Sequence, residues 1–232
     1  MQRLLIAALA PATAAGLVLV APTTSHAADA PSITAITVKP SLAVQTGHNR
    51  QKITVQIQTN AADVDASAIP VRGSGGLVFS PKKIRDGLWE ATDYLYNYEA
   101  AGTWTVDVTA WDADYNDTKK SKTFQVRRGT YFAGFGASPS KVRRGKAISV
   151  AGQLRGLNSY GEYVPFRGQK VTIYFKKKGT QKWVRYAVVT TARNGKFTKR
   201  FKAKASGWWI AGYAGNATWY KSLSKSKGVV VR

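Results

Sequence analysis

The chain has 232 residues and a net charge of +23, from 35 Lys and Arg against 12 Asp and Glu. It contains no Cys and two His. The lack of Cys excludes disulfides, a cysteine-linked lipid and thiol nucleophiles, and the scarcity of His argues against zinc centres and Ser/His/Asp triads. We therefore expect a protein that is stabilised by an ordinary apolar core, without covalent or metal staples.

The positive charge is concentrated in the second half of the chain. Residues 129–232 carry 22 Lys and Arg against a single acid, Glu162, for a net charge of +21. Residues 29–128 carry 12 Lys and Arg against 11 Asp and Glu, for a net charge of +1. A field of one sign attracts polymers of the opposite sign and carries no information about the fold. The second half is therefore predicted to bind polyanions.

The first 27 residues have the pattern of a cleaved secretory signal peptide. Arg3 precedes an apolar run over residues 4–20, and Ser25-His26-Ala27 supplies the small residues of a cleavage site before Ala28. No later stretch approaches the ~20 apolar residues that a membrane-spanning helix needs. We expect export, with the mature protein extracellular or loosely associated with the cell wall.

The remaining chain suits two domains of about 100 residues each, which is a common domain size. The charge balance changes at Arg128-Gly129-Thr130. This change places a near-neutral domain over residues 31–128 and a strongly basic domain over residues 130–232.

Both domains have the sequence pattern of short β-strands. Ile53, Val55 and Ile57 alternate with polar residues, and residues 104–111 alternate in the same way, which predicts half-buried antiparallel strands. Asn194-Gly195 is predicted to form a type I′ turn between two paired strands, and residues 176–181 a hairpin tip. In the second domain, strands are predicted at 148–154, 171–175, 183–191, 196–204, 208–213 and 229–231. The predicted fold class is all-β, with two tandem immunoglobulin-like β-sandwiches after the signal peptide.

Five segments combine turn glycines with core aromatic and aliphatic residues, at 101–112, 141–154, 171–179, 194–197 and 207–215. Together they resemble secreted actinobacterial proteins built from two immunoglobulin-like modules. The resemblance covers roughly residues 32–232 and lies mostly in turn and core positions, so it implies the fold more than an activity. Proteins of this group have poorly defined functions, and the calcium-binding label that some carry implies a calcium site.

The turn at residues 112–117 is the candidate metal site, because Asp112, Asp114, Asn116 and Asp117 place oxygen atoms as calcium loops do. An EF-hand is excluded, since its sixth and twelfth positions would be Asp117 and Thr123 instead of Gly and Glu. Two interpretations remain. One is a solvated hairpin turn, for which Asp and Asn are ordinary residues. The other is a looser calcium site completed by carbonyls, water or another loop, with calcium as the one cofactor that the sequence suggests.

Basic residues of the second domain form the candidate polyanion site. They precede one strand, crown the 176–181 hairpin tip and alternate along residues 196–204, where Phe197 and Phe201 are expected to point inward. Lys199 interrupts the inward face and is therefore expected at a sheet edge or near the end of its strand. The candidate residues are Arg143, Arg144, Lys146, Lys176, Lys177, Lys178, Lys182, Lys196, Arg200, Lys202 and Lys204. The alternative is a charged soluble surface without a ligand, although such surfaces usually mix both signs.

Outside a cell, the anionic polymers open to this domain are cell-wall phosphate polymers, acidic polysaccharides and nucleic acid. Sequence-specific nucleic-acid recognition is not expected, because no RRM, KH or helix-turn-helix pattern is present. Aromatic residues near the end of the chain offer either a sugar-stacking platform or core packing, and core packing is expected for most of them: Trp183, Trp208, Trp209, Tyr213, Trp219 and Tyr220. Trp208 and Trp209 must face opposite ways in a strand, so one is expected in the core and the other in solvent.

No set of residues predicts catalysis. After removal of the signal peptide His48 remains, in a predicted turn. Paired carboxylates, as in glycosidases, would have to come from a loop-rich stretch that is expected at the surface, with Asp86, Glu90, Asp93 and Glu99. We therefore predict a secreted, non-catalytic module that binds polyanions. The alternatives are a calcium-binding protein that uses the 112–117 turn, and a structural accessory or inhibitor that recognises another protein through its loops.

Overall fold

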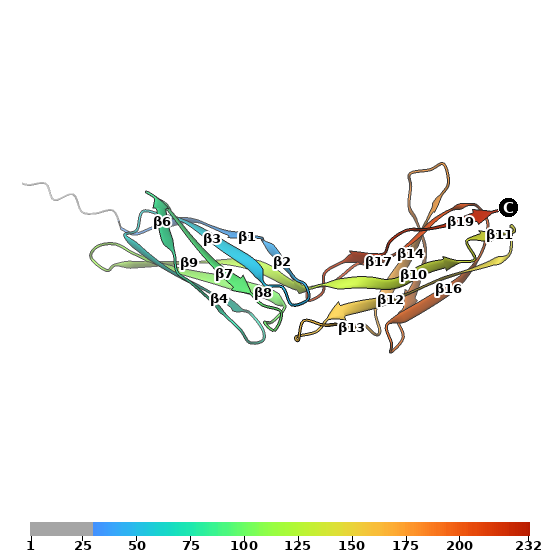
Figure 1. The fold of residues 1–232 in the computed structure, drawn as a ribbon. Helices are drawn as coiled ribbons and strands as arrows, with labels where there is room; N and C mark the ends of the chain where they lie inside the picture. The colour runs from blue at the N-terminus through green and yellow to red at the C-terminus, as the bar shows by residue number, and fades with distance from the viewer. Residues whose placement is uncertain (1–29) are drawn as a thin grey trace, which may run out of the picture.

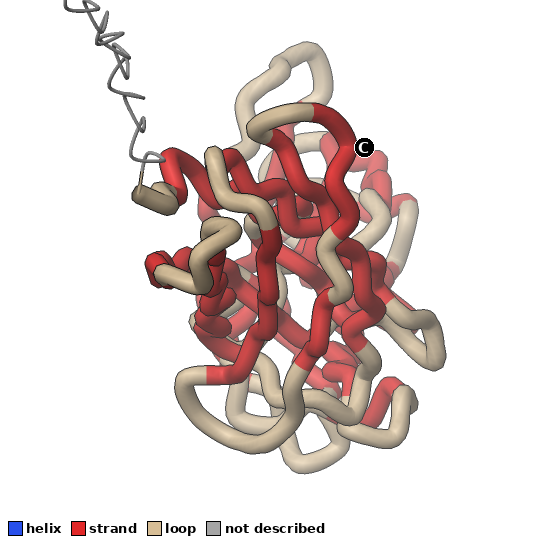
Figure 2. Tube along the Cα trace, turned by 90° about the vertical axis from the view of Figure 1, so that its left-hand side faces the viewer, coloured by secondary structure: helices blue, strands red, loops and turns tan. Residues whose placement is uncertain are grey.

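The computed structural model describes residues 30–232, so the predicted signal peptide lies outside the described residues. Within that range the chain forms nineteen strands and no helix (Figures 1 and 2). Accordingly, the described part of the chain has no helix that could cross a membrane. The strands make two sandwiches that lie end to end along one axis (Figure 1). The predicted all-β class with two tandem immunoglobulin-like sandwiches is confirmed.

The first sandwich has the strand order of an immunoglobulin domain. One sheet has the order β1 (Ile33–Lys39), β3 (Gln51–Thr59), β7 (Leu88–Leu95), β6 (Lys82–Arg85). The other has the order β2 (Leu42–Gln45), β9 (Asp117–Arg128), β8 (Gly102–Trp111), β4 (Asp63–Pro70), β5 (Leu77–Phe79). These orders correspond to strands ABED facing A′GFCC′. The predicted alternation is confirmed, since Ile53, Val55 and Ile57 are fully buried on β3.

The second sandwich follows the same plan. Its smaller sheet consists of β10 (Thr130–Ser138), β12 (Ala147–Leu157), β13 (Tyr163–Pro165) and β16 (Lys196–Lys202). Its larger sheet has the order β11 (Lys141–Val142), β19 (Lys227–Val231), β17 (Gly207–Tyr213), β14 (Lys170–Lys177), β15 (Val184–Thr190), with β18 (Ser222–Leu223) beside β17. In both sandwiches the second strand pairs in parallel with the last one, as β2 with β9 and β11 with β19.

Each sandwich has its own apolar core, with a tryptophan at the same place. Trp104 on β8 follows Gly102 by two residues, and Trp209 on β17 follows Gly207 by two residues. Both indoles are buried. Because successive side chains of a strand point to opposite faces, the neighbouring Trp208 is turned to solvent, with 37% of its surface exposed. The prediction that one indole of this pair is core and the other exposed is confirmed.

The two sandwiches are joined by a single residue, Gly129, which contacts both of them. Its N–H donates to the Gln45 carbonyl of the first sandwich at 2.9 Å, and its carbonyl accepts the Leu157 N–H of the second at 3.0 Å. Arg128, at the end of β9, makes two backbone hydrogen bonds to the second sandwich. Its N–H donates to the Thr218 carbonyl and its carbonyl accepts the Tyr220 N–H, both at 2.8 Å. The last strand of the first sandwich is thus held by a loop of the second.

The predicted type I′ turn at Asn194-Gly195 is wrong. A type I′ turn needs positive φ at both central residues, and here φ is positive at Gly195 (71°) but not at Asn194. The Gly195 N–H donates to the Ala192 carbonyl at 2.9 Å, as in a type I turn followed by a left-handed glycine. The flanking strands do not pair, because β15 pairs with β14 and β16 pairs with β12. The segment between β15 and β16 therefore crosses from one sheet to the other. Strands joined by such a crossover alternate in sequence just as the two strands of a hairpin do, so the pattern does not distinguish them.

Candidate functional site

Four segments meet at the end of the second sandwich that lies away from Gly129. The Gly145 N–H donates to the Ala203 carbonyl at 2.8 Å, and the Arg144 N–H donates to the Arg232 carbonyl at 2.9 Å. The Lys178 N–H donates to the Ser206 carbonyl at 2.9 Å. β12 starts at this end and runs toward Gly129. These bonds therefore gather basic residues that are far apart in the sequence.

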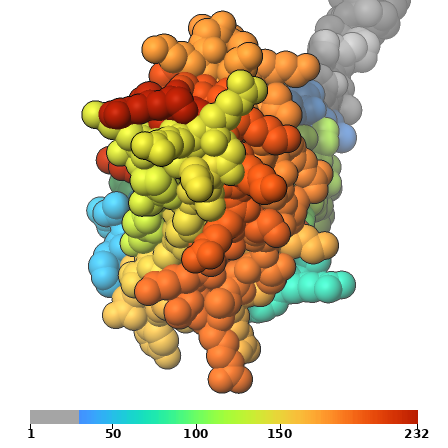
Figure 3. Space-filling view, turned by 90° about the vertical axis from the view of Figure 1, so that its right-hand side faces the viewer, coloured from blue at the N-terminus to red at the C-terminus, as the bar shows by residue number. Residues whose placement is uncertain are grey.

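We call this surface the distal basic end and define it as Arg143, Arg144, Lys146, Lys178, Lys202, Lys204 and Arg232. All seven side chains are exposed. Figure 3 looks onto this end of the molecule, where the yellow segment around residue 145 lies against the orange and red C-terminal segments. Sequence reasoning omitted Arg232, because its return to this cluster depends on the pairing of β19 with β11 and on the hydrogen bond from the Arg144 N–H to the Arg232 carbonyl.

The outer face of β16 carries a second group of predicted residues. Lys196, Arg200 and Lys202 lie opposite Gln153, Ser149 and Ala147 of β12, on the face away from the core. Lys196 is six residues from Lys202, or roughly 20 Å along an extended strand, so it lies apart from the distal basic end. Phe197 and Phe201 point inward as predicted, and Lys199 lies on an edge strand as predicted. The strand ends at Lys202, so Lys204 is not part of its alternation.

The hairpin between β14 and β15 carries Lys176, Lys177, Lys178 and Lys182. Lys176 differs from the others because it is half-buried. Its Nζ lies 5.2 Å from the centroid of the Trp183 ring and 5.4 Å from that of Trp208. Both distances fall within the range of cation–π attraction. The ammonium group therefore lies within cation–π distance of two indole rings.

The cations of the second sandwich have no internal counter-ions. The described structure contains two ion pairs, Lys83–Asp86 at 2.8 Å and Lys119–Asp117 at 3.2 Å, and both belong to the first sandwich. In the first of them, the hydrogen bond and charge of Lys83 lower the pKa of the Asp86 carboxyl. Glu162, the single acid of the basic domain, accepts a hydrogen bond from the Asn158 side chain at 3.2 Å. The positive charge of the second sandwich is consequently not neutralised by ion pairs within the described residues.

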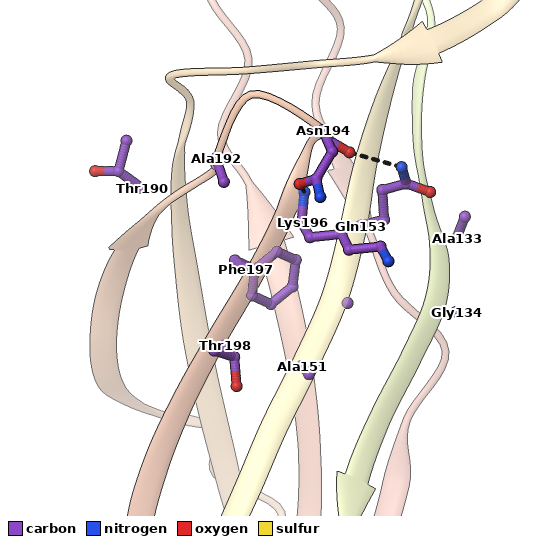
Figure 4. A pocket seen from close by; sticks show the side chains of 11 residues that line it. Ala133, Gly134, Ala151, Gln153, Thr190, Ala192, Asn194, Lys196, Phe197 and Thr198 are labelled. Atoms are coloured by element: carbon purple, nitrogen blue, oxygen red, sulfur yellow. Dashed lines mark hydrogen bonds between the residues drawn. The ribbon is translucent and has the colours of Figure 1, made fainter.

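A hollow of about 870 Å³ lies over the small residues Ala133, Ala151 and Gly152 (Figure 4). The Gln153 side chain donates to the Asn194 carbonyl at 2.7 Å along its rim. Lys196 is the single charged residue in its lining. The hollow therefore lies apart from the main concentration of positive charge.

The 112–117 turn is closed by Asp112 itself. One carboxylate oxygen accepts the N–H groups of Asp114 and Asn116, and the other accepts the Asn116 side-chain amide, all at 2.9 Å. These bonds, led by the one from the Asn116 side chain, lower the pKa of Asp112. Asp117 is paired with Lys119. Within residues 30–232, no three His, Cys, Asp or Glu side chains form a group that could hold a metal ion. The calcium site stays a prediction that rests on the resemblance and the residue types.

The remaining aromatic candidates divide between core and surface. Trp209 and Tyr213 are buried, whereas Trp183, Trp219 and Tyr220 are half-buried. Trp219 packs against Phe166, with ring centroids 4.3 Å apart. Most of the candidates thus contribute to packing, and Trp208 is the most exposed of them.

Two titratable residues of the first sandwich need separate comment. His48 lies in a turn and is exposed, as predicted, and it is close to Gly161 of the second sandwich, where a Cβ atom would come 2.7 Å from its Nδ1. Glu99 was expected at the surface, but only 5% of its surface is exposed. Its carboxylate accepts the Tyr96 N–H at 2.9 Å. Burial, more than the nearby charge of Asp93, raises the pKa of Glu99.

No family model matches the chain, and no curated protein matches it. The resemblance to secreted actinobacterial proteins therefore stays a prediction. An I-band fragment of titin is 9% identical over 88% of this chain and 66% of that chain, with a TM-score of 0.40. A tetra-tandem repeat from the extending region of a large adhesion protein is 12% identical over 86% and 49%, with a TM-score of 0.39. The Yersinia pseudotuberculosis adhesin InvE is 13% identical over 86% and 58%, with a TM-score of 0.31. Likenesses at these TM-scores assign this chain neither a family nor a function.

Proposed function

We propose that this protein is a secreted, non-catalytic module that binds anionic polymers outside the cell through its distal basic end. The observation that carries the proposal is the uncompensated charge of the second sandwich. Its 22 Lys and Arg face one acid in the sequence, and among its described residues there is no ion pair. Seven of these basic residues lie at one end of the molecule, where backbone hydrogen bonds hold their segments together.

The physical basis of binding is the release of counter-ions. A polymer with closely spaced negative charges carries condensed cations, which a basic surface displaces on contact. Arginine adds bidentate hydrogen bonds to phosphate or carboxylate groups, whereas lysine acts as a point charge. Such a surface recognises the charge density of the polymer and not the order of its units. The interaction must therefore weaken steeply as salt is added.

The test compares two variants with the same change in net charge. The distal variant carries Arg143→Gln, Arg144→Gln, Lys202→Gln and Lys204→Gln, and affinity for long-chain inorganic polyphosphate is measured over a salt series. We expect at least tenfold weaker binding at low salt, and a salt slope that is smaller by about one unit for each phosphate group that the variant no longer neutralises. The control variant carries four exposed residues of the first sandwich changed to Gln: Lys52, Lys82, Arg85 and Lys122. It should retain the affinity of the unchanged protein within about threefold.

Two results would overturn the proposal. If the unchanged protein passes unretained through a phosphate-bearing resin in dilute buffer, the electrostatic mechanism is wrong. If the control variant loses as much affinity as the distal variant, binding reflects the net charge of the whole chain and the distal basic end has no special role.

A further inference from the structure

We infer that the hollow beside Trp208 binds one acidic sugar unit, so that the anionic polymer is a polysaccharide with carboxylate or phosphate groups. This inference rests on the proposed function and specifies its ligand. The hollow has a volume of about 310 Å³ and adjoins the distal basic end, with which it shares Lys178. Trp208 is the aromatic residue of its lining, and the lysines Lys141 and Lys178 also line it.

The pairing of strands explains why the indole is accessible. Trp208 lies on the outer face of β17, opposite Gly228 of β19 on one side and Lys176 of β14 on the other. A Cβ atom at Gly228 would lie 3.5 Å from the Trp208 Nε1 atom. Because Gly228 has no side chain, the space beside the indole stays open. A larger residue at position 228 would fill this space.

Lys176 fixes the second side of the indole. Its Nζ lies over both Trp183 and Trp208, and its side chain is half-buried. The negative faces of the indoles hold the ammonium group in place. The hollow therefore has a positioned aromatic wall and three nearby cations, from Lys141, Lys176 and Lys178.

An acidic sugar matches this arrangement chemically. The C–H groups of a sugar ring are weakly positive and pack against the negative face of an aromatic ring. A carboxylate or phosphate on the same sugar reaches an ammonium group to form a charge-assisted hydrogen bond. Small-molecule sites usually combine aromatic residues with a few polar groups, as this hollow does. The volume of the hollow, about 310 Å³, lies at the lower end of the range for such sites, which starts at about 300 Å³.

Nucleic acid fits the same surface less well. Proteins that bind single strands stack successive bases on a series of aromatic rings. Here Trp208 is the single aromatic residue that lines the hollow, so successive bases have no second ring in it on which to stack. One exposed indole among cations favours a single sugar unit over a run of bases.

The experiment measures the affinity of the full mature chain for an oligogalacturonate, an inorganic polyphosphate and a single-stranded oligonucleotide at low salt. The Trp208→Ala variant should bind the oligogalacturonate about tenfold more weakly and the polyphosphate within about twofold of the unchanged protein. The Gly228→Val variant keeps the indole but fills the hollow, and it should show the same selective loss. The control is Tyr160→Ala, which removes an exposed aromatic ring of the same domain, 79% exposed, and should change none of the three affinities.

The outcomes separate this inference from the proposed function. If the unchanged protein binds none of the three polymers, the proposed function fails and this inference fails with it. If it binds all three but neither variant weakens the oligogalacturonate selectively, the proposed function stands and the Trp208 site is wrong. A selective loss of oligonucleotide binding in both variants would also overturn the inference, since the ligand of the hollow would then be nucleic acid.

Discussion

The two sandwiches share one strand plan but differ in their charge. Both place A′-like and G-like strands in parallel, and both bury a tryptophan two residues after a glycine on the equivalent strand. Yet residues 29–128 have a net charge of +1 and residues 129–232 a net charge of +21. The shared features lie at inward positions, and the charge difference lies at outward ones. Inward positions therefore determine this fold, while outward positions are free to specify a partner.

The sandwiches also differ at one edge of their smaller sheets, next to β7 in the first sandwich and at β16 in the second. In the first sandwich, β6 extends the smaller sheet beyond β7. In the second, β16 is itself the edge, and an aromatic cluster fills the space between it and β15. Tyr186 packs against Phe201 and Trp209 with ring centroids 5.1 Å apart in both contacts. Aromatic side chains thus pack at the edge of the second sandwich where the first sandwich has the additional strand β6.

The largest expected effect tests whether each sandwich depends on its own tryptophan. Trp104→Ala and Trp209→Ala should each destabilise their sandwich by about 3–5 kcal/mol, because each leaves a large cavity among buried side chains. Urea unfolding followed by circular dichroism measures the loss. If Trp209→Ala costs less than about 1 kcal/mol, the aromatic cluster of the second sandwich is not a packed core and the two domains are not equivalent.

A change at the junction tests whether the sandwiches are coupled. A Cβ atom at Gly129 would lie 2.7 Å from the Tyr163 hydroxyl and 2.8 Å from the Gln45 carbonyl oxygen. Gly129→Ala should therefore lower the free energy of unfolding by about 1–3 kcal/mol. The control is Gly136→Ala, at a position where a Cβ atom would meet nothing within 4 Å. Equal stability of the two variants would show that the junction gives way without cost.

A more conservative substitution separates the two tryptophans. The Trp104 Nε1–H donates to the Ala100 carbonyl at 2.8 Å, whereas the buried Trp209 Nε1 has no partner among the described residues. Trp104→Phe would leave the carbonyl unpaired, but Trp209→Phe would remove an unsatisfied donor. Trp104→Phe should therefore be more destabilising, by about 1–2 kcal/mol. Equal losses in urea unfolding would mean that the Trp209 donor is satisfied in solution.

Sequence reasoning placed residues correctly where alternation within a single strand determines whether a side chain is buried. Alternation placed Ile53, Val55 and Ile57 in the core, and it required Trp208 and Trp209 to face opposite ways. It could not say which tryptophan was buried, because that depends on the sheet that covers β17. It also missed the gathering of Arg144 and Arg232, since two residues so far apart in the chain leave no local pattern when they meet. The hollow beside Trp208 was hidden for the same reason, because it requires Gly228 to lie opposite the indole.

Glu99 is the position where the charged residue type was most misleading, and it gives the smallest predicted effect. Its carboxyl is buried, and Gln45 donates to its backbone carbonyl at 3.0 Å. Burial raises the pKa of Glu99 in the folded state above its unfolded value. The folded chain therefore keeps this proton at a pH where the unfolded chain has lost it. Stability must fall as pH rises from the ordinary glutamate pKa through the raised folded-state pKa, and it must level off above that.

Glu99→Gln should remove this contribution, because the amide oxygen still accepts the Tyr96 N–H and carries no charge. The stability difference between the variant and the unchanged protein should grow in favour of the variant as the pH rises above the ordinary glutamate pKa of about 4.3, and it should become constant above the raised folded-state pKa. Urea unfolding at a series of pH values measures it. Parallel curves would mean that the carboxylate is solvated in the folded protein.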